Sequence, residues 1–366
     1  MKTDLKNKLS TFILCGFFLF VSLWCIFKGP TNYSESERRV LAFFPEINSQ
    51  SIFSTSFMSD FETYTLDQFP LRENFRQLKA GVSFGIFKNS DNNGVFYKNG
   101  YAAKIEKEVN PSMLEHASER FNYLCETYLD ESNKVFLSII PDKSVFMKEQ
   151  GLVSYDFSLL SESLREMNSN MKYIDIFPLL SLEDYYKTDT HWKQTELLDV
   201  AEKLAKEMGV AFEDNFEKKT LDVDFYGVYK GQLALNLPAE TIEYFENETL
   251  SSCKVTSYDK GYPREASVYD FEKAKGKDAY EFFLSGSDAL LVVENPKAET
   301  EKELVVFRDS FASSLIPLLL PSYKTITLVD IRYIQSSLLG NFVEFENKDI
   351  LFLYSSLILN SSLSLK

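Results

Sequence analysis

The chain has 366 residues, and its 45% apolar content is enough for the packed core of one large domain or two ordinary ones. Its net charge of -15 argues against nucleic acid as a partner, because phosphate backbones are bound by basic surfaces. The four cysteines and two histidines form neither a Cys-x-x-Cys pair nor a histidine cluster. The sequence therefore predicts no disulfide framework, no metal site and no other cofactor.

The first 28 residues predict a targeting or anchoring segment. Lysines precede an uncharged apolar run from Thr11 to Phe27, whose length is near the lower limit for a helix that spans the hydrocarbon core. A cleaved signal peptide is the alternative, but no small-x-small cleavage site follows the run. We therefore expect residues 1–28 to be a cytoplasmic tail and an uncleaved single-pass transmembrane anchor, with the C-terminal domain on the extracellular side.

A linker, a broken helix and a hairpin are predicted after the anchor. Residues 29–60 are polar and interrupted by Pro45, which predicts an extended linker, and the main domain is expected over 61–366. A helix-like stretch over 57–79 is broken at 69–72, where we expect Arg72 to pair with a buried acid. Residues 95–101 predict a hairpin after the turn at 91–94.

Helical and apolar strand-like segments then alternate along the chain. A helix capped by Asn110, with Pro111 in its first turn, precedes a strand over 134–140 and a helix over 158–168. A strand over 173–177 and a helix closed by Gly209 follow. Further strands are predicted over 289–293, 303–307, 325–330 and 349–354. This alternation is typical of a three-layer α/β fold with a mostly parallel central sheet.

Residues 210–285 interrupt the alternation. They are rich in aromatic and charged residues and have weak periodicity, so we interpret them as an aromatic-rich insertion with irregular strands that covers part of the active site.

Three residues have the chemistry of an acyl-transfer site. His191 stands two residues after Asp189, which is close enough to orient its ring, although Asp189 or Thr190 as a helix cap is the simpler alternative. Ser310 follows an apolar strand and precedes a helix, where helix N-terminal N–H groups stabilise developing negative charge. An ordinary helix cap is again the alternative for Ser310. His116 is expected to be a solvated surface residue.

Several short motifs, in order, make the chain resemble the DHHW family of low-GC Gram-positive bacteria, which is related to the SGNH-hydrolase-like proteins that O-acetylate alginate. The matching stretches are residues 38–42, 68–72, 94–97, 186–192, 225–229, 308–311 and 330–332. The resemblance implies an SGNH-hydrolase-like sandwich with Ser310 as nucleophile, His191 as base and Asp189 as its orienting acid. Only the second histidine of the family's pair is present, since Thr190 replaces the first.

The oxyanion hole departs from the broader SGNH pattern. Arg308 replaces the glycine of Gly-Asp-Ser, and no clear Gly-x-Asn-Asp block is found. The backbone N–H of Ser310 is one candidate oxyanion donor, and Arg332 is a second. For sugar binding the sequence offers a set of aromatic residues, which are equally well explained as core residues: Trp192, Tyr186, Tyr226 and Tyr229.

These features predict a membrane-anchored extracellular O-acetyltransferase or esterase that acts on a cell-surface polysaccharide through an acetyl-enzyme. The alternatives are a carbohydrate deacetylase and a non-catalytic anchored assembly protein of a surface-glycan system. The related alginate system suggests a multi-pass membrane O-acyltransferase as a partner that supplies the acetyl group, because no phosphate-cradling glycine-rich loop is present.

Overall fold

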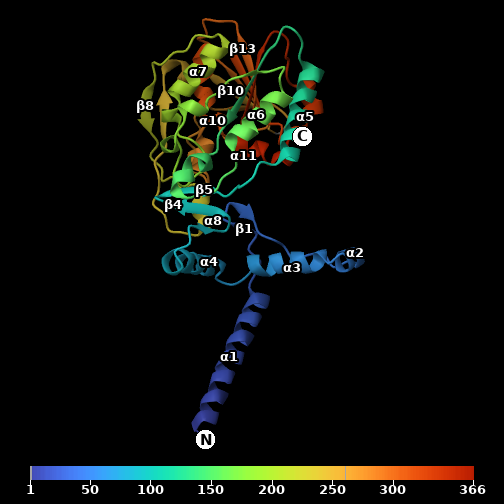
Figure 1. Ribbon diagram of the computed structural model, residues 1–366, viewed down its shortest axis with the longest axis vertical. Helices are drawn as coiled ribbons and strands as arrows, with labels where there is room; N and C mark the ends of the chain where they lie inside the picture. The colour runs from blue at the N-terminus through green and yellow to red at the C-terminus, as the bar shows by residue number, and fades with distance from the viewer. Residues whose placement is uncertain (1, 260) are drawn as a thin grey trace. The chain divides into compact units, whose positions relative to one another are not determined.

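A computed structural model describes residues 2–259 and 261–366 of the chain (Figure 1). The chain divides into two compact units. Unit 1 contains the residues up to Asn93 together with Lys230–Asn236, and unit 2 contains Gly94–Tyr229 and Leu237–Lys366. The short piece Lys230–Asn236, which lies within the predicted insertion, is thus part of unit 1.

Unit 1 begins with the helix α1 (Lys2–Phe27). Its stretch Leu5–Phe27 has a mean hydropathy of 2.3 and is long and apolar enough to cross a membrane. The predicted apolar helix at the N-terminus is therefore present in the structure.

The rest of unit 1 is built from short strands and helices. They are β1 (Tyr33–Ser34), β2 (Arg39–Val40), α2 (Ser49–Phe53), α3 (Ser56–Asp67), α4 (Arg72–Gly81), the π-helix η1 (Val82–Ile86) and β3 (Asp91–Asn92). The predicted break between two helices is confirmed: Pro70 separates α3 from α4, and Leu71 has a positive φ of 59°. The segment predicted as a linker contains β1, β2 and α2.

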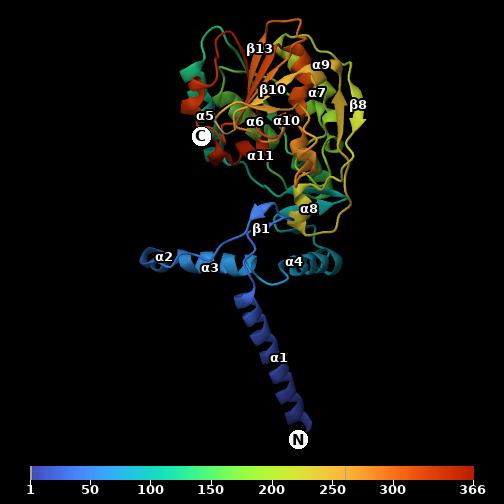
Figure 2. The same cartoon turned by 180° about the vertical axis from the view of Figure 1, so that it is seen from behind.

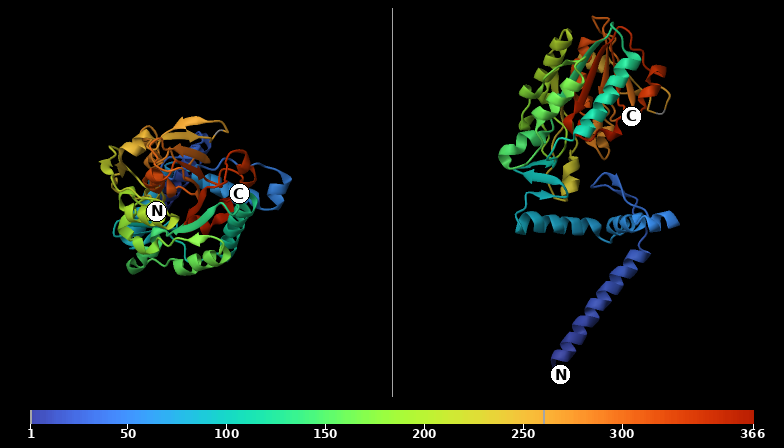
Figure 3. Two further views of the ribbon diagram at one scale, coloured as in Figure 1. Left: turned by 90° about the horizontal axis from the view of Figure 1, so that it is seen from above. Right: turned by 45° about the vertical axis from the view of Figure 1, so that its right-hand side comes forward.

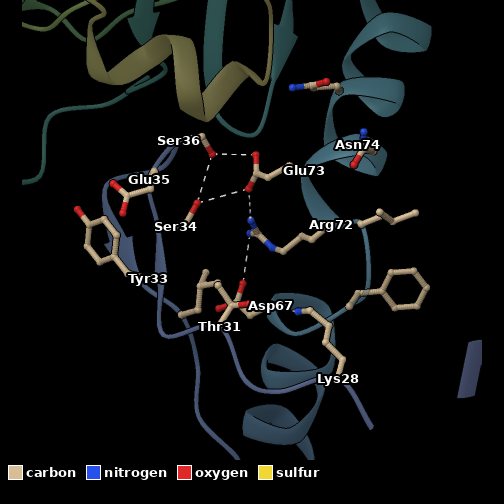
Figure 4. A pocket seen from close by; sticks show the side chains of 14 residues that line it. Lys28, Thr31, Tyr33, Ser34, Glu35, Ser36, Asp67, Arg72, Glu73 and Asn74 are labelled. Atoms are coloured by element: carbon tan, nitrogen blue, oxygen red, sulfur yellow. Dashed lines mark hydrogen bonds and ion pairs between the residues drawn. The ribbon is translucent and has the colours of Figure 1, made fainter. Parts of the chain in front are cut away.

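Ion pairs around Asp67 connect the end of α3 to β2 and to the start of α4. Arg72 lies between the carboxylates of Glu73 and Asp67, as Figure 4 shows, and Asp67 is only 4% exposed. Arg72 also pairs with Glu37. Arg39 makes two further hydrogen bonds to Asp67. The expected pairing of Arg72 with a buried acid is thus confirmed.

Unit 2 is built on an eight-stranded sheet in the order β11-β10-β12-β14-β13-β15-β6-β7. Its strands are β6 (Lys134–Ile140), β7 (Lys172–Tyr173), β10 (Lys254–Ser257), β11 (Arg264–Ala266), β12 (Leu290–Glu294), β13 (Glu303–Arg308), β14 (Thr325–Val329) and β15 (Asp349–Ser355). The five strands from β14 to β7 are parallel, whereas β12, β10 and β11 are added antiparallel. The sheet is therefore mixed and mostly parallel, as predicted.

Helices cover both faces of the sheet, because alternate residues of its central strands enter two separate cores (Figures 1 and 3). One core contains residues of α5 (Pro111–Tyr128) and α6 (Phe157–Met167). The other contains residues of α7 (Leu198–Met208), α10 (Ala312–Leu315) and the 3-10 helix η8 (Ile316–Ser322). Cys125 packs against the first core and Cys253 against the second, and both are free thiols.

Local signals in the sequence are confirmed with small differences. β4 (Val95–Lys98) and β5 (Tyr101–Lys104) form the expected hairpin, closed by Asn99 and Gly100 at positive φ. Gly209 ends α7 in the left-handed conformation. Asn110 stands before α5, but its side chain makes no capping hydrogen bond. The strand predicted over 173–177 is shorter in the structure: β7 covers only Lys172–Tyr173, and a 3-10 turn begins at Phe177.

The aromatic-rich segment 210–285 contributes more regular structure than its weak periodicity suggests. It contains the separate strand pair β8 (Glu217–Thr220) and β9 (Glu243–Glu246), the helix α9 (Glu248–Ser252), and two strands at one end of the large sheet, the edge strand β11 and its neighbour β10. Figure 2 shows β8 and α9 on the side of unit 2 that also carries α7.

Candidate active site

Ser310 lies where β13 ends at the carboxyl edge of the sheet. The strand runs to Arg308, and α10 begins at Ala312, so Ser310 is in the short turn between them. Its neighbour Asp309 fixes this turn by accepting hydrogen bonds from the backbone N–H groups of Phe311 (3.0 Å) and Ser355 (2.7 Å). Ser310 itself is half-buried, in a region where most side chains are fully buried.

The structure brings Ser310, His191 and Asp189 into one hydrogen-bonded chain. The distance from Ser310 Oγ to His191 Nε2 is 2.8 Å, and the distance from His191 Nδ1 to Asp189 Oδ1 is 2.6 Å. The serine and the histidine are 119 residues apart in the sequence. Both distances are within the range needed for direct proton transfer between a nucleophile and its base.

The environment of Asp189 determines which ring nitrogen of His191 carries the proton. Burial by itself raises the pKa of this carboxyl, but the charge of His191, its hydrogen bond and the backbone N–H groups of Val228 and His191 together hold the pKa below its usual range. An ionised carboxylate can only accept hydrogen bonds. His191 therefore donates from Nδ1 to Asp189, and its Nε2 is free to accept the proton of Ser310.

Two aromatic rings restrain the imidazole of His191. The ring of Tyr280 stacks on it with centroids 3.8 Å apart and planes at 8°, and Phe311 packs at 4.9 Å. The Tyr280 hydroxyl donates to Ser314 Oγ at 2.8 Å, so the stacked ring is itself held in place. Since Tyr280 comes from the 210–285 segment, this segment directly contacts the candidate base.

The loop that carries Asp189 and His191 is held by the buried charge of Lys143 and by the half-buried carboxylate of Glu240. The Nζ of Lys143, a residue without solvent exposure, donates to the backbone carbonyls of Tyr186 (2.8 Å), Lys187 (3.1 Å) and Asp189 (2.5 Å). Burial lowers the pKa of Lys143 to about 8.

The carboxylate of Glu240 binds the N–H and hydroxyl groups of the same loop. It accepts hydrogen bonds from the backbone N–H groups of Lys187 (2.6 Å) and Thr188 (2.8 Å) and from the Thr188 hydroxyl (2.6 Å). Lys143 thus binds the carbonyl groups of the loop, and Glu240 binds its N–H groups.

The stretch 225–229, one of the motifs of the family resemblance, packs directly against this loop. The backbone N–H of Val228 donates to Asp189 Oδ2 at 3.0 Å, and that of Gly227 donates to Thr188 Oγ1 at 3.1 Å. A Cβ at Gly227 would lie 2.1 Å from the backbone of Thr188, so only glycine fits here. This motif therefore supports the carboxylate that orients His191.

Arg308 and Arg332, the two arginines considered for the oxyanion hole, donate hydrogen bonds to other groups of the protein. Arg308 is fully buried, and its guanidinium donates to Ser313 Oγ at 2.9 Å and to backbone carbonyls, including those of Gly286 and Asp288 (3.4 Å each). Arg332 donates from Nε and Nη2 to Asp330 at 2.9 and 2.6 Å. These two N–H groups of Arg332 are therefore not available to an oxyanion.

Most of the aromatic residues that the sequence offers for sugar binding are core residues. Trp192 (0% exposed), Tyr186 (1%) and Tyr229 (3%) lack the open ring face that stacking on a sugar requires. Trp192 instead donates from its indole N–H to the Phe311 carbonyl at 3.0 Å. Only Tyr226, which is 39% exposed, has a surface position. His116 is half-buried and bonded to Ser362 rather than fully solvated.

Sequence reasoning missed Lys143, Glu240 and Tyr280 as neighbours of the site. Lys143 had a detectable signal, because it lies three residues after a buried parallel strand, much as Ser310 lies two residues after another. Glu240 and Tyr280 lie in the segment of weak periodicity and had none. In the ranges 2–259 and 261–366, no group of three or more His, Cys, Asp or Glu side chains is placed to hold a metal ion.

Known structures share the fold of this chain at low sequence identity. A DHHW family protein from Eubacterium siraeum is 18% identical, with a TM-score of 0.59 over 74% of this chain and 93% of that protein. Bacillus cereus PatB1, solved with a sulfonyl adduct, is 15% identical, with a TM-score of 0.59 over 72% and 95%. No protein-family model matches the sequence, and no curated protein matches it. The chain therefore has the fold of a DHHW family protein, as the motifs indicate.

Proposed function

We propose that this protein is an SGNH-like O-acetyltransferase or esterase that acts on a cell-surface polysaccharide. The observation that carries the proposal is the continuous chain of hydrogen bonds from Ser310 through His191 to Asp189. These are the parts of serine acyl transfer, and the likeness in fold to a DHHW family protein supports the same assignment.

In the proposed reaction His191 Nε2 takes the proton of Ser310 as Oγ attacks the acetyl carbonyl. The imidazolium that forms is stabilised by the Asp189 carboxylate 2.6 Å from Nδ1. The tetrahedral intermediate collapses when the donor alcohol leaves with the proton from Nε2, which leaves an acetyl-Ser310 ester. A sugar hydroxyl then gives its proton to His191 Nε2 as its oxygen attacks the acetyl ester, and His191 returns that proton to Ser310 Oγ as the ester bond to the serine breaks. Water in place of the sugar gives hydrolysis. The backbone N–H of Ser310 is the oxyanion donor that we propose.

The anchor and the partner belong to the same proposal. If α1 spans the membrane with the lysine-bearing tail inside, the rest of the chain lies outside the cell, where acetyl-CoA is absent. A multi-pass membrane O-acyltransferase would then supply the acetyl group, and a tethered domain would meet it at high effective concentration.

Covalent labelling tests the nucleophile. A sulfonyl fluoride should modify Ser310 and block turnover of an acetyl ester, and peptide mass spectrometry should locate the adduct there. His191→Ala should prevent the labelling. The matched control is His116→Ala, because His116 is the only other histidine and is bonded to Ser362 at a distance from this chain of contacts. Labelling that is equal in both variants would contradict the proposal.

The direction of transfer needs a second experiment. The acetyl content of the surface glycan should fall when Ser310→Ala replaces the intact protein in cells, if the protein adds acetyl groups. A rise would identify a carbohydrate deacetylase, and no change alongside unlabelled Ser310 would favour a non-catalytic assembly protein.

A further inference from the structure

The helix α4 in unit 1 has its polar and apolar sides reversed relative to an ordinary helix of a soluble protein. Leu71, Phe75 and Leu78, spaced to share one side of the helix, are 53%, 51% and 62% exposed. The charged Arg72 and Arg76 on the other side are only 16% and 12% exposed.

Ion pairs and hydrogen bonds fix the rotation of α4 about its axis. Arg72 reaches Glu37 at 2.5 Å and Asp67 at 3.2 Å, and Figure 4 shows it turned from α4 toward Asp67. Arg76 donates to the Gly231 carbonyl at 2.7 Å and to Glu73 at 3.0 Å. Because the polar side is held inward by these contacts, the apolar side must face outward.

Apolar side chains that flank α4 in the sequence are exposed as well. Phe69 just before it is 36% exposed, and Ile86 and Phe87 after it are 71% and 69% exposed. Other large apolar side chains of unit 1 outside α1 are also more than half exposed; they are Val40, Phe43, Phe44 and Ile47 before α2, Ile52 and Phe53 in α2, and Met58 and Leu66 in α3. A set of this extent marks a surface that is covered in the working protein.

The residues that follow α1 contact Gln68, just before α4, and this contact relates the exposed apolar residues to the membrane. The amide of Gln68, which lies three residues before Leu71, accepts from the backbone N–H of Thr31 at 2.8 Å and donates to the Thr31 carbonyl at 2.9 Å. Lys28, the first residue after α1, reaches the Gln68 carbonyl at 3.5 Å. The start of α4 is therefore held at the level where α1 would leave the bilayer, and α4 runs crosswise to α1 (Figures 1 and 3).

We infer that α4 and its flanking residues lie in the interface of the membrane that α1 spans, with Phe69, Leu71, Phe75, Leu78, Ile86 and Phe87 inserted among the lipids. This membrane-contact face rests on the proposed membrane span of α1 but not on the proposed chemistry of Ser310. An amphipathic helix that lies flat at the bilayer surface has one apolar face in the acyl boundary and its polar face toward the protein or water. Together α1 and the membrane-contact face attach unit 1 to the bilayer at two points.

Tryptophan fluorescence tests the membrane-contact face in the full chain, reconstituted in phosphatidylcholine vesicles with brominated acyl chains. The chain has two tryptophans, Trp24 in α1 and the fully buried Trp192. In the natural sequence, quenching of Trp24 reports whether α1 is inserted. Phe75→Trp in a Trp24→Phe background then reports on α4, with Trp192 as a constant contribution measured in the Trp24→Phe protein alone.

The matched control is Phe271→Trp in the same background, because Phe271 is 50% exposed in unit 2 and Phe75 is 51% exposed. We expect Phe75→Trp to lose emission to bromines near the headgroups more than to bromines near the bilayer centre, and Phe271→Trp to keep its emission. Leu78→Trp repeats the measurement if Phe75→Trp folds poorly.

One outcome would overturn the inference and leave the anchor intact. Quenching of Trp24 with none at Phe75→Trp or Leu78→Trp would show that α4 is away from lipid. If the aqueous quencher iodide also failed to reach these positions, a protein partner or a second copy would cover the face. Failure of Trp24 to quench would overturn the span of α1 and the inference with it, while labelling of Ser310 would remain a separate result.

Discussion

The helices α4 and α7 are both strongly amphipathic, yet they bury opposite sides. The α7 residues Val200, Ala201, Leu204, Ala205 and Met208 are at most 1% exposed and pack against the sheet. The corresponding apolar side of α4 is exposed, and its arginines are buried in ion pairs instead. Amphipathicity in a sequence therefore predicts that a helix lies at a boundary between two environments, but it does not say whether the apolar side faces a protein core or something outside it.

The two regions also differ in what their buried carboxylates contact. Asp189 near α7 and Asp67 near α4 are both almost fully buried, and partners hold the pKa of each carboxyl below its usual range. The carboxylate of Asp189 acts on His191, which in turn reaches a half-exposed serine. The carboxylate of Asp67 is enclosed by Arg39, Arg72 and the backbone N–H of Ala42. The first arrangement can move a proton, whereas the second can only hold a structure together.

The sharpest way to separate these two aspartates is to convert each to asparagine. Asp189→Asn should lower turnover of an acetyl ester by roughly a thousandfold or more, because an amide donor favours the wrong tautomer of His191. Asp67→Asn should leave the turnover of the folded protein near normal. Steady-state kinetics on both variants and on Ser310→Ala decides this, and the losses of Ser310→Ala and Asp189→Asn should not add in the double variant. Equal loss in both asparagine variants would remove the distinction.

The second test concerns the packing of the two helices. Leu204→Ala in α7 should lower the free energy of unfolding by about 2–5 kcal/mol, because it leaves a cavity against the sheet. Denaturant titration of the detergent-solubilised full chain measures this. A change below about 1 kcal/mol would mean that α7 is packed more loosely than the structure shows.

A third test uses Lys143, whose buried ammonium donates hydrogen bonds to backbone carbonyls of the loop that carries Asp189. Burial lowers the pKa of Lys143 from its ordinary value of 10.5 to about 8, so at a pH between these two values the folded state binds fewer protons than the unfolded state. The free energy of unfolding should therefore rise as the pH rises from about 8 to 9.5, by at most about 1.4 kcal/mol per pH unit. Below about pH 8 the lysine is charged in both states, so its burial lowers the free energy of unfolding by its full amount.

The rise should be absent in Lys143→Met and present in Lys148→Met, which removes an exposed lysine of the same 3-10 helix. Unfolding midpoints measured at both pH values for the three proteins provide the comparison. A rise that persists in Lys143→Met would assign the pH dependence to other groups.

The smallest expected effect completes the comparison of the helices. Leu78→Ala in α4 should change the free energy of unfolding by no more than about 0.5 kcal/mol in detergent, because its side chain is 62% exposed and leaves no cavity. The same titration as for Leu204→Ala measures it. A loss as large as that of Leu204→Ala would place Leu78 in a protein core and contradict the outward orientation of α4.

The sequence by itself determined the features that depend on local pattern. The apolar run of α1, the break at Pro70, the Asn99-Gly100 hairpin and the alternation that predicts a mostly parallel sheet are all properties of neighbouring residues. The two-residue spacing of Asp189 and His191 and the strand-end position of Ser310 were also visible, because parallel strands bring such ends to one edge of the sheet.

Only the tertiary structure decided how distant segments meet. Three sets of contacts join residues that no sequence period relates. Ser310 bonds to His191, Lys143 and Glu240 bind the loop that carries Asp189, and Tyr280 stacks on His191. The same holds for burial: Trp192 became a core residue, and Leu78 stayed outside although both are large and apolar. Local propensity and periodicity specify which residues share a side of an element, whereas the environment of that side depends on long-range packing and on the solvent or membrane around it.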